Sequence, residues 1–187
     1  SLYLEAQTVA RESSASDFQT GQVGEVYDSD GNRIALLQND KNIIYLTSDQ
    51  IPELVKQAFV SIEDKRFYKH HGSDPFAIVR AVTSLLGKGK ITQGGSTITQ
   101  QLLKNNVFDF MSEDGMLDKI ERKLQEQYLA IQLEKIMDKK IILKNYLNTI
   151  TLGNNPLGVK AAALRYFDKD VSDLTLSEAT VIAGITQ

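Results

Sequence analysis

Proline placement constrains the fold of this chain more than any other feature of its sequence. The chain has three prolines, and none lies between Phe76 and Asn155. Because proline inside a helix removes a hydrogen bond and clashes with the preceding turn, this proline-free stretch permits long helices. Asp74 precedes Pro75 and Asn155 precedes Pro156, which is the order of an N-cap followed by the first helical residue. The pattern predicts a mainly α chain whose helices begin at the prolines.

Apolar periodicity places helices at about residues 52–62, 75–87, 97–106, 116–137, 139–149, 156–167 and 175–185. Residues 22–46 instead alternate between apolar and polar side chains around a turn-forming run at 28–32, which predicts a short N-terminal β element, a hairpin or a small ribbon. We therefore expect two parts. Residues 1–47 form a linker with the small β element, and residues 48–187 form the functional domain.

Composition excludes several classes of function. The 21 Lys+Arg residues against 24 Asp+Glu residues give a net charge of −3, which argues against a nucleic-acid partner. The absence of cysteine excludes disulfides and thiolate metal sites. No apolar run reaches the roughly 18 residues that span a bilayer. Because the chain opens at Ser1 without Met and closes at Gln187 in an apolar stretch, we expect a fragment of a longer protein.

Two adjacent carboxylates, Glu63 and Asp64, end an apolar helix and are followed by Lys65, His70 and His71. A carboxylate at the edge of a core with cations nearby can have its pKa moved in either direction, which suits a general base. The alternative is an exposed helix end with solvated charges. No His-x-x-x-His spacing occurs, so a zinc site built by the protein is not expected. A hard cation held jointly by a phosphate and one carboxylate is left open.

A glycine-rich loop precedes the helix expected at 97–106. Gly94 and Gly95 are followed by Ser96 and Thr97, so free amide and hydroxyl groups would point at whatever lies before the helix. With Lys104 two turns later, such a loop holds an anion, most plausibly phosphate. The alternative is an ordinary capped helix. The spacing does not match the P-loop, which disfavours nucleotide binding. No organic cofactor is expected.

The helix expected at 116–137 carries two apolar faces, so we expect it to be buried on two sides. One face has Leu117, Ile120, Leu124 and Ile131, and the other has Leu129, Leu133 and Ile136. Glu126 lies beside the second face, with Arg122 one turn earlier and Lys123 nearby. A glutamate at the edge of a core is costly to place without a cationic partner. The alternative is a simple Arg122–Glu126 pair, worth roughly a few tenths of a kcal/mol.

These motifs follow one another in an order that resembles a known family. They occupy residues 63–72, 94–105, 122–126, 139–148 and 158–184. Any single motif could arise by chance, whereas the ordered set over about residues 48–187 resembles the peptidoglycan glycosyltransferase domain, glycosyltransferase family 51. That domain occurs in class A penicillin-binding proteins and monofunctional transglycosylases. The resemblance implies a mainly α, lysozyme-like lobe, a smaller membrane-associated lobe, and polymerisation of lipid II into glycan strands.

The resemblance also implies roles for individual residues. Glu63 would deprotonate the 4-hydroxyl of the acceptor N-acetylglucosamine, which attacks C1 of the donor N-acetylmuramic acid with inversion while the lipid diphosphate leaves. Glu126 would orient the cations of the site or a divalent cation, Mg or Mn, on the diphosphate. The other expected substrate-binding residues are Asp64, His70, Ser96, Thr97, Gln100, Lys104, Arg122 and Lys123.

The partners that the resemblance implies are lipid II, the growing glycan strand and a membrane surface. The implied location is the extracytoplasmic face of the bacterial cell membrane, with the anchor missing from this fragment. A C-terminal transpeptidase domain in the full-length protein is left open.

Two other functions are weighed against transfer. A lysozyme-like hydrolase needs a sugar acid and access for water but no diphosphate cradle. The Gly94-Gly95-Ser96 loop together with Lys104, Arg122 and Lys123 therefore argues for synthesis. A noncatalytic glycan- or lipid-binding module would keep the cations and tolerate the loss of Glu63.

Overall fold

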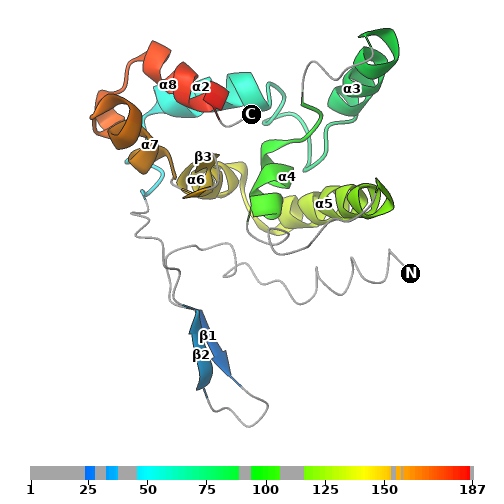
Figure 1. Cartoon of the computed structure of the whole chain (residues 1–187), viewed down its shortest axis with the longest axis horizontal. Coiled ribbons are helices and arrows are strands. Elements are labelled where there is room, and N and C mark those ends of the chain that lie inside the picture. Colours follow the sequence, from blue (N-terminus) through cyan, green and yellow to red (C-terminus); the bar gives the residue numbers. More distant parts are fainter. Residues whose placement is uncertain are drawn as a thin grey trace.

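The computed structural model describes residues 24–27, 33–37, 46–88, 94–105, 116–152, 155–156 and 158–185. The described part is mainly helical, which confirms the predicted class (Figure 1). The helices are α2 (Glu53–Glu63), α3 (Pro75–Lys88), α4 (Ile98–Leu103), α5 (Met116–Ile136), α6 (Lys139–Thr149), α7 (Gly158–Phe167) and α8 (Leu176–Ile185), with a 3-10 turn, η3 (Val171–Asp173).

Two short antiparallel ribbons accompany the helices. Strand β1 (Gly24–Tyr27) pairs with β2 (Arg33–Leu37), as expected for the N-terminal hairpin, whose turn at 28–32 lies outside the described residues. Strand β3 (Thr151–Leu152) pairs with β4 (Asn155–Pro156) between α6 and α7.

A helix begins at Pro75, as predicted, but the prediction that one begins at Pro156 is wrong. Helix α3 begins at Pro75, and the carboxylate of Asp74 accepts the Phe76 amide at 3.0 Å, which is the expected cap. Pro156 instead lies in β4, and α7 begins two residues later at Gly158, which has a φ of 65°. The backbone must turn back toward α6 before this helix can start, and glycine makes that turn at little cost.

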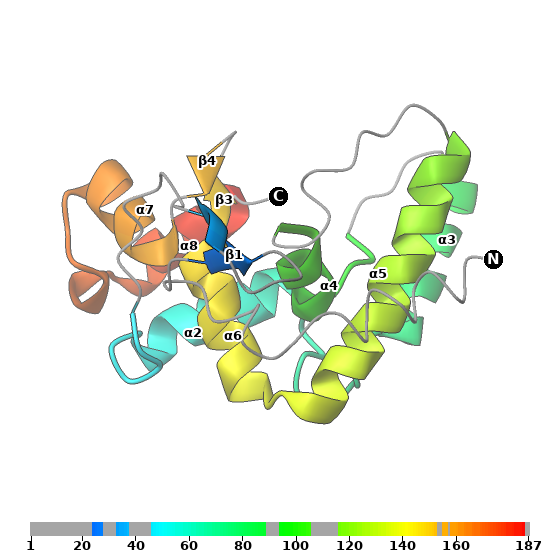
Figure 2. The same cartoon turned by 90° about the horizontal axis from the view of Figure 1, so that it is seen from below.

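The core lies where six helices meet. Helix α2 packs against α8, α4 packs against both α5 and α6, and α6 packs against α7. The rings of Phe59 from α2 and Tyr146 from α6 meet edge to face at 6.2 Å between centroids. Figures 1 and 2 both place α3 and α5 at one end of the helical body and α7 and α8 at the other, with α4 and α6 between them. Helix α4, which follows the glycine-rich loop, therefore lies at the centre.

The prediction that the 116–137 helix is buried on two sides is wrong. Leu129 and Leu133 are buried, but Leu124 is 53% exposed and Ile131 is 37% exposed. The reason is that α5 packs on α4 through one face and lies at the end of the body. Among the described helices, none is both long enough and apolar enough to cross a membrane.

Candidate active site

Glu63 is the last residue of α2, and its position follows from how that helix is anchored. One side of α2 is buried through Val55 and Phe59, and the helix ends because the backbone of Asp64 leaves the helical region (φ −154°, ψ 75°). Glu63 itself is half-buried, and its Oε2 accepts a hydrogen bond from Nε2 of Gln101 at 2.8 Å. The hydroxyl of Tyr146 donates in turn to Oε1 of Gln101 at 3.2 Å. Helices α4 and α6 thus hold the carboxylate that the sequence nominates as the base.

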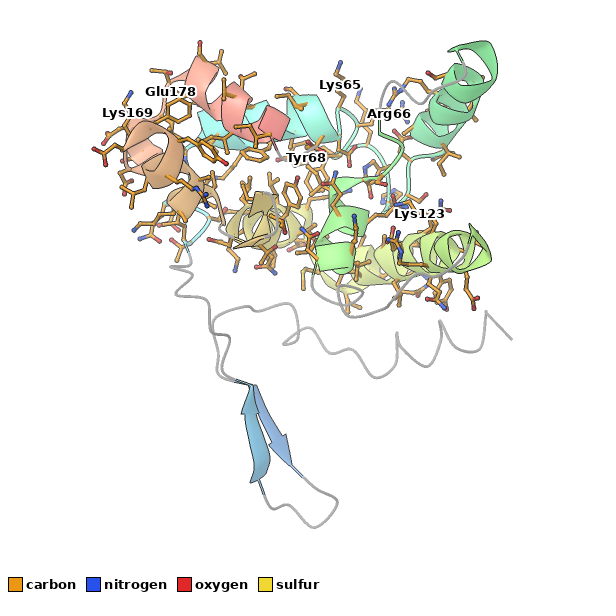
Figure 3. All side chains as sticks on the ribbon, viewed as in Figure 1. Lys65, Arg66, Tyr68, Lys123, Lys169 and Glu178 are labelled. Atoms are coloured by element: carbon orange, nitrogen blue, oxygen red, sulfur yellow. The ribbon has the colours of Figure 1, made fainter. Side chains whose placement is uncertain are left out.

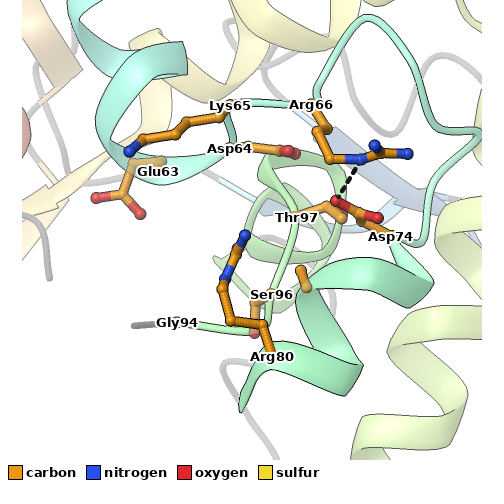
Figure 4. Close-up of a pocket in the computed structure, with 10 residues that line it drawn as sticks. Glu63, Asp64, Lys65, Arg66, Asp74, Arg80, Gly94, Ser96 and Thr97 are labelled. Atoms are coloured by element: carbon orange, nitrogen blue, oxygen red, sulfur yellow. Dashed lines mark ion pairs between the residues drawn. The ribbon is translucent and has the colours of Figure 1, made fainter. Parts of the chain in front are cut away.

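A pocket with an empty volume of about 270 Å³ opens beside Glu63. Its lining includes carboxylates, cations and hydroxyls: Glu63, Asp64, Lys65, Arg80, Ser96 and Thr97 (Figure 4). Arg66 and Asp74 also line it and form an ion pair, with 3.1 Å between Nε and Oδ2. The pocket therefore brings the end of α2 together with the glycine-rich loop, as the motifs require.

Asp64 and His70 are turned inward and contact each other. Oδ2 of Asp64 lies 2.8 Å from Nε2 of His70, and both side chains are less than 5% exposed. The same Asp64 oxygen accepts the backbone amide of Ile98, the first residue of α4, at 3.0 Å. This carboxylate ties the end of α2 to the start of α4. These contacts suit a positioning role for the pair, and the predicted contact of Asp64 and His70 with substrate stays a prediction.

The loop before α4 divides into two parts with different partners. Thr97 and Gln100 form a reciprocal capping box, and the Thr97 hydroxyl donates to the Gly72 carbonyl at 2.6 Å. The alternative of an ordinary capped helix therefore describes these two side chains. Ser96 differs, because its hydroxyl oxygen accepts a hydrogen bond from Nζ of Lys123 at 2.7 Å. Within this loop, Ser96 joins the pocket to a cation.

Glu126 is fully buried, and cations engage both of its carboxylate oxygens. Arg122 contacts Oε1, and Nζ of Lys123 lies 2.7 Å from Oε2. Lys123 extends from α5 (Figure 3), and its side chain is 41% exposed. One carboxylate thus orients two cations, which leaves an excess positive charge beside Ser96. Such a group can stabilise an anion.

Lys104 does not share this arrangement. It lies exposed at the end of α4 and is not among the residues that line the pocket. The structure thus places Glu63 and Ser96 in one pocket and links Ser96 to Lys123, whereas Lys104 lies outside that pocket.

The donor set around Glu126 does not fit a divalent cation. Both oxygens of this carboxylate already face cationic side chains, and a metal ion would have to displace them. Within the described residues, no group of three or more histidine, aspartate or glutamate side chains could hold a metal. No step of the chemistry proposed below passes through a metal on Glu126.

Sequence reasoning missed Gln101 and Tyr146. It selected Gln100, whose side chain caps α4, whereas the next residue reaches Glu63. A buried tyrosine hydroxyl usually has a polar partner, so Tyr146 carried a usable signal. Which of two adjacent glutamines faces α2 depends on how α4 is rotated about its axis, and the capping box sets that rotation.

Similarity to known proteins assigns the chain to a family. It matches the family model described as Transglycosylase over residues 30–187. It is 46% identical over 164 residues to penicillin-binding protein 1A of Aquifex aeolicus, covering 88% of this chain and 22% of that protein. It is 47% identical over 161 residues to penicillin-binding protein 1A of Escherichia coli, covering 86% of this chain and 18% of that protein. The chain spans about a fifth of the length of these relatives. The resemblance carried by the motifs is confirmed, and the chain belongs to the transglycosylase family of peptidoglycan glycosyltransferases.

Proposed function

We propose that this chain polymerises lipid II into glycan strands by inverting transfer, with release of a lipid diphosphate. The observation that carries the proposal is the pairing, in one pocket, of a half-buried carboxylate with a hydroxyl that a lysine contacts. Glu63 is held by Gln101, while Ser96 accepts from Lys123. A base and an anion-stabilising group side by side are what glycosyl transfer from a diphosphate requires.

In this proposal Glu63 takes the proton from the 4-hydroxyl of the acceptor sugar. The freed oxygen forms a bond to C1 of the donor sugar, and the bond from C1 to the phosphate oxygen breaks. The departing diphosphate takes the electron pair, and Lys123 and Arg122 stabilise its charge. Glu126 keeps those two cations in place. Any Mg²⁺ or Mn²⁺ would be carried by the diphosphate itself.

A membrane surface is part of the same proposal. Phe76 and Val79 of α3 and Leu124 and Ile131 of α5 are exposed apolar side chains on the two helices at one end of the body. These residues suit the smaller membrane-associated lobe that the family resemblance implies, and the remaining helices would form the lysozyme-like lobe. Lipid II presents its sugars at a membrane, so apolar contact near the pocket would assist its capture.

The proposal keeps the predicted boundaries and setting. Residues 1–47 would be a linker with the β element, and residues 48–187 the glycosyltransferase domain. The relatives are penicillin-binding proteins several times longer than this chain, which supports a larger parent with a transpeptidase domain at the outer face of the cell membrane.

The test is polymerisation of labelled lipid II by the chain and by its Glu63→Gln variant. We expect lysozyme-sensitive polymer from the wild type and a rate lower by a factor of about 10²–10⁴ or more in the variant, because a general base contributes that much. Glu53→Gln, at the exposed start of α2, is the matched control and should polymerise normally. Equal rates for Glu63→Gln and the wild type would refute the base assignment. Cleavage of preformed glycan without polymer would indicate the hydrolase.

A further inference from the structure

A second group of buried polar side chains extends from the Asp64–His70 pair toward α5 and α6. Nζ of Lys139, at the start of α6, lies 3.4 Å from Nδ1 of His70 and 2.8 Å from Oε1 of Glu134. The Thr99 hydroxyl donates to the same Glu134 oxygen at 2.5 Å. This group, here called the Lys139 network, connects four helices: α2 ends next to Asp64, α4 carries Thr99, α5 carries Glu134 and α6 carries Lys139.

The Lys139 network is almost closed to solvent. The side chains of Asp64, His70 and Glu134 are each less than 5% exposed, and that of Lys139 is 22% exposed. Its ammonium also lies 4.3 Å from the centre of the Phe67 ring, a distance suited to a cation–π contact. Two buried carboxylates are thus accompanied by one ammonium that reaches Glu134 directly and Asp64 through the imidazole. A lysine held this closely has a defined orientation.

The chemistry of the donors decides which nitrogen of His70 carries the proton. A lysine ammonium can only donate hydrogen bonds, so Nδ1 facing Lys139 must accept. In the neutral imidazole the proton then lies on Nε2, which donates to Oδ2 of Asp64. The other tautomer would aim an N–H group at the ammonium and leave the carboxylate facing a lone pair. Lys139 therefore selects the tautomer that bonds Asp64.

We propose that Lys139 is a positioning residue for glycosyl transfer, acting through His70 and Asp64. The inference rests on the proposed function, because it assigns Lys139 to the same site. Oδ2 of Asp64 accepts both the His70 proton and the Ile98 amide, so the tautomer of His70 determines how firmly the start of α4 is held. Ser96 lies two residues before Ile98, and Glu63 is the neighbour of Asp64. This tautomer thereby holds Glu63 and the Ser96 hydroxyl, which Lys123 contacts, in a constant position relative to each other.

Histidine NMR tests the first step directly, since the chain has two histidines and the second, His71, is exposed. In the wild-type chain at neutral pH, ¹⁵N–¹H correlations should show His70 as the Nε2–H tautomer and His71 as an averaged signal. Lys139→Met should give His70 a mixture of tautomers. Lys139→Arg, which keeps a cationic donor, should restore the single tautomer. Lys140→Met, at the exposed neighbouring position on α6, is the matched control and should change nothing.

Kinetics with lipid II tests the second step. Lys139→Met should lower kcat by a factor of up to about 10², because a misplacement of about 1 Å at a reacting site can cost that much, with little change in KM. Lys139→Arg should recover most of the rate. A wild-type His70 in the Nδ1–H form, or Lys139→Met with unchanged tautomer and kcat, would overturn the proposal. The wild-type spectrum decides this even if a variant misfolds. Should the wild type make no polymer, the proposed function fails while the tautomer assignment is still judged by NMR.

Discussion

Replacing Glu126 by glutamine tests the electrostatic arrangement on α5. The buried carboxylate accepts from Arg122 through one oxygen and from Lys123 through the other. Glu126→Gln keeps the shape but leaves one acceptor oxygen, and its amide N–H groups then face a cation. The variant should therefore lose stability, and Lys123 should no longer be held against Ser96.

The magnitude follows from burial. Removing one partner of a fully buried ion pair costs about 3–5 kcal/mol, because the other charge stays buried and unpaired. Here the partners reach solvent in part, since the side chain of Arg122 is 16% exposed and that of Lys123 is 41% exposed. Exposed pairs are worth at most about 1 kcal/mol. We therefore expect an intermediate loss of about 2 kcal/mol in the free energy of unfolding, which corresponds to a Tm lower by about 4–8 °C.

The assay combines thermal denaturation followed by circular dichroism with lipid II polymerisation at a temperature where the variant stays folded. Glu126→Gln should polymerise far more slowly than the wild type, and Glu121→Gln on the same helix should match the wild type in both measurements. The Mg²⁺ dependence of the residual rate should keep its wild-type midpoint, because the geometry does not fit a metal ion on Glu126. An unchanged Tm, or a displaced Mg²⁺ midpoint, would refute this reasoning.

Two further predictions concern backbone geometry and pH. Gly72→Ala should lower the free energy of unfolding by about 2–5 kcal/mol, because the φ of 90° strains any side chain and a Cβ would lie 2.4 Å from the α5 backbone. Gly87→Ala, on α3 with open space around the added Cβ, is the control and should not destabilise the protein. Equal denaturation midpoints for the two variants would contradict this expectation. Contacts with Lys169 and Thr175 lower the pKa of Glu178 from 4.5 to about 2. The stability that this carboxylate contributes should therefore be complete above about pH 4.5 and disappear as the pH falls toward 2. NMR titration of Glu178 and acid unfolding of Glu178→Gln against the wild type can check this. A titration midpoint of Glu178 near pH 4.5 would contradict the prediction.

Local rules accounted for most of the helix boundaries. Helix α2 was expected at about 52–62 and occupies Glu53–Glu63, and the cap at Asp74 formed as its position before proline predicts. The same rule failed at Pro156 because this residue pairs with Thr151 in the β3–β4 ribbon. The same turn-forming residues occur before a helix and at the end of a strand, so the local sequence does not say which of the two Asn155 and Pro156 form. The tertiary structure decides it, because the chain turns back toward α6 at this point.

The candidate site was likewise predicted only in part from the sequence. Motif order placed Glu63, Ser96, Lys123 and Glu126 in one functional set, and the structure connects them through one pocket and a chain of contacts. Motif order could not predict that Gln101 rather than Gln100 would reach Glu63, because which glutamine faces Glu63 depends on the rotation of α4 against α2.

The sequence by itself determined the helical class, most helix ends and the family, because proline geometry, capping and apolar spacing act over a few residues and motif order needs no coordinates. Tertiary packing alone decided which face of α5 is covered and which way the neighbours Glu63 and Asp64 point. It also decided that Lys139 meets His70. These outcomes depend on contacts between segments far apart in the chain, where small rotations of a helix exchange one neighbour for another.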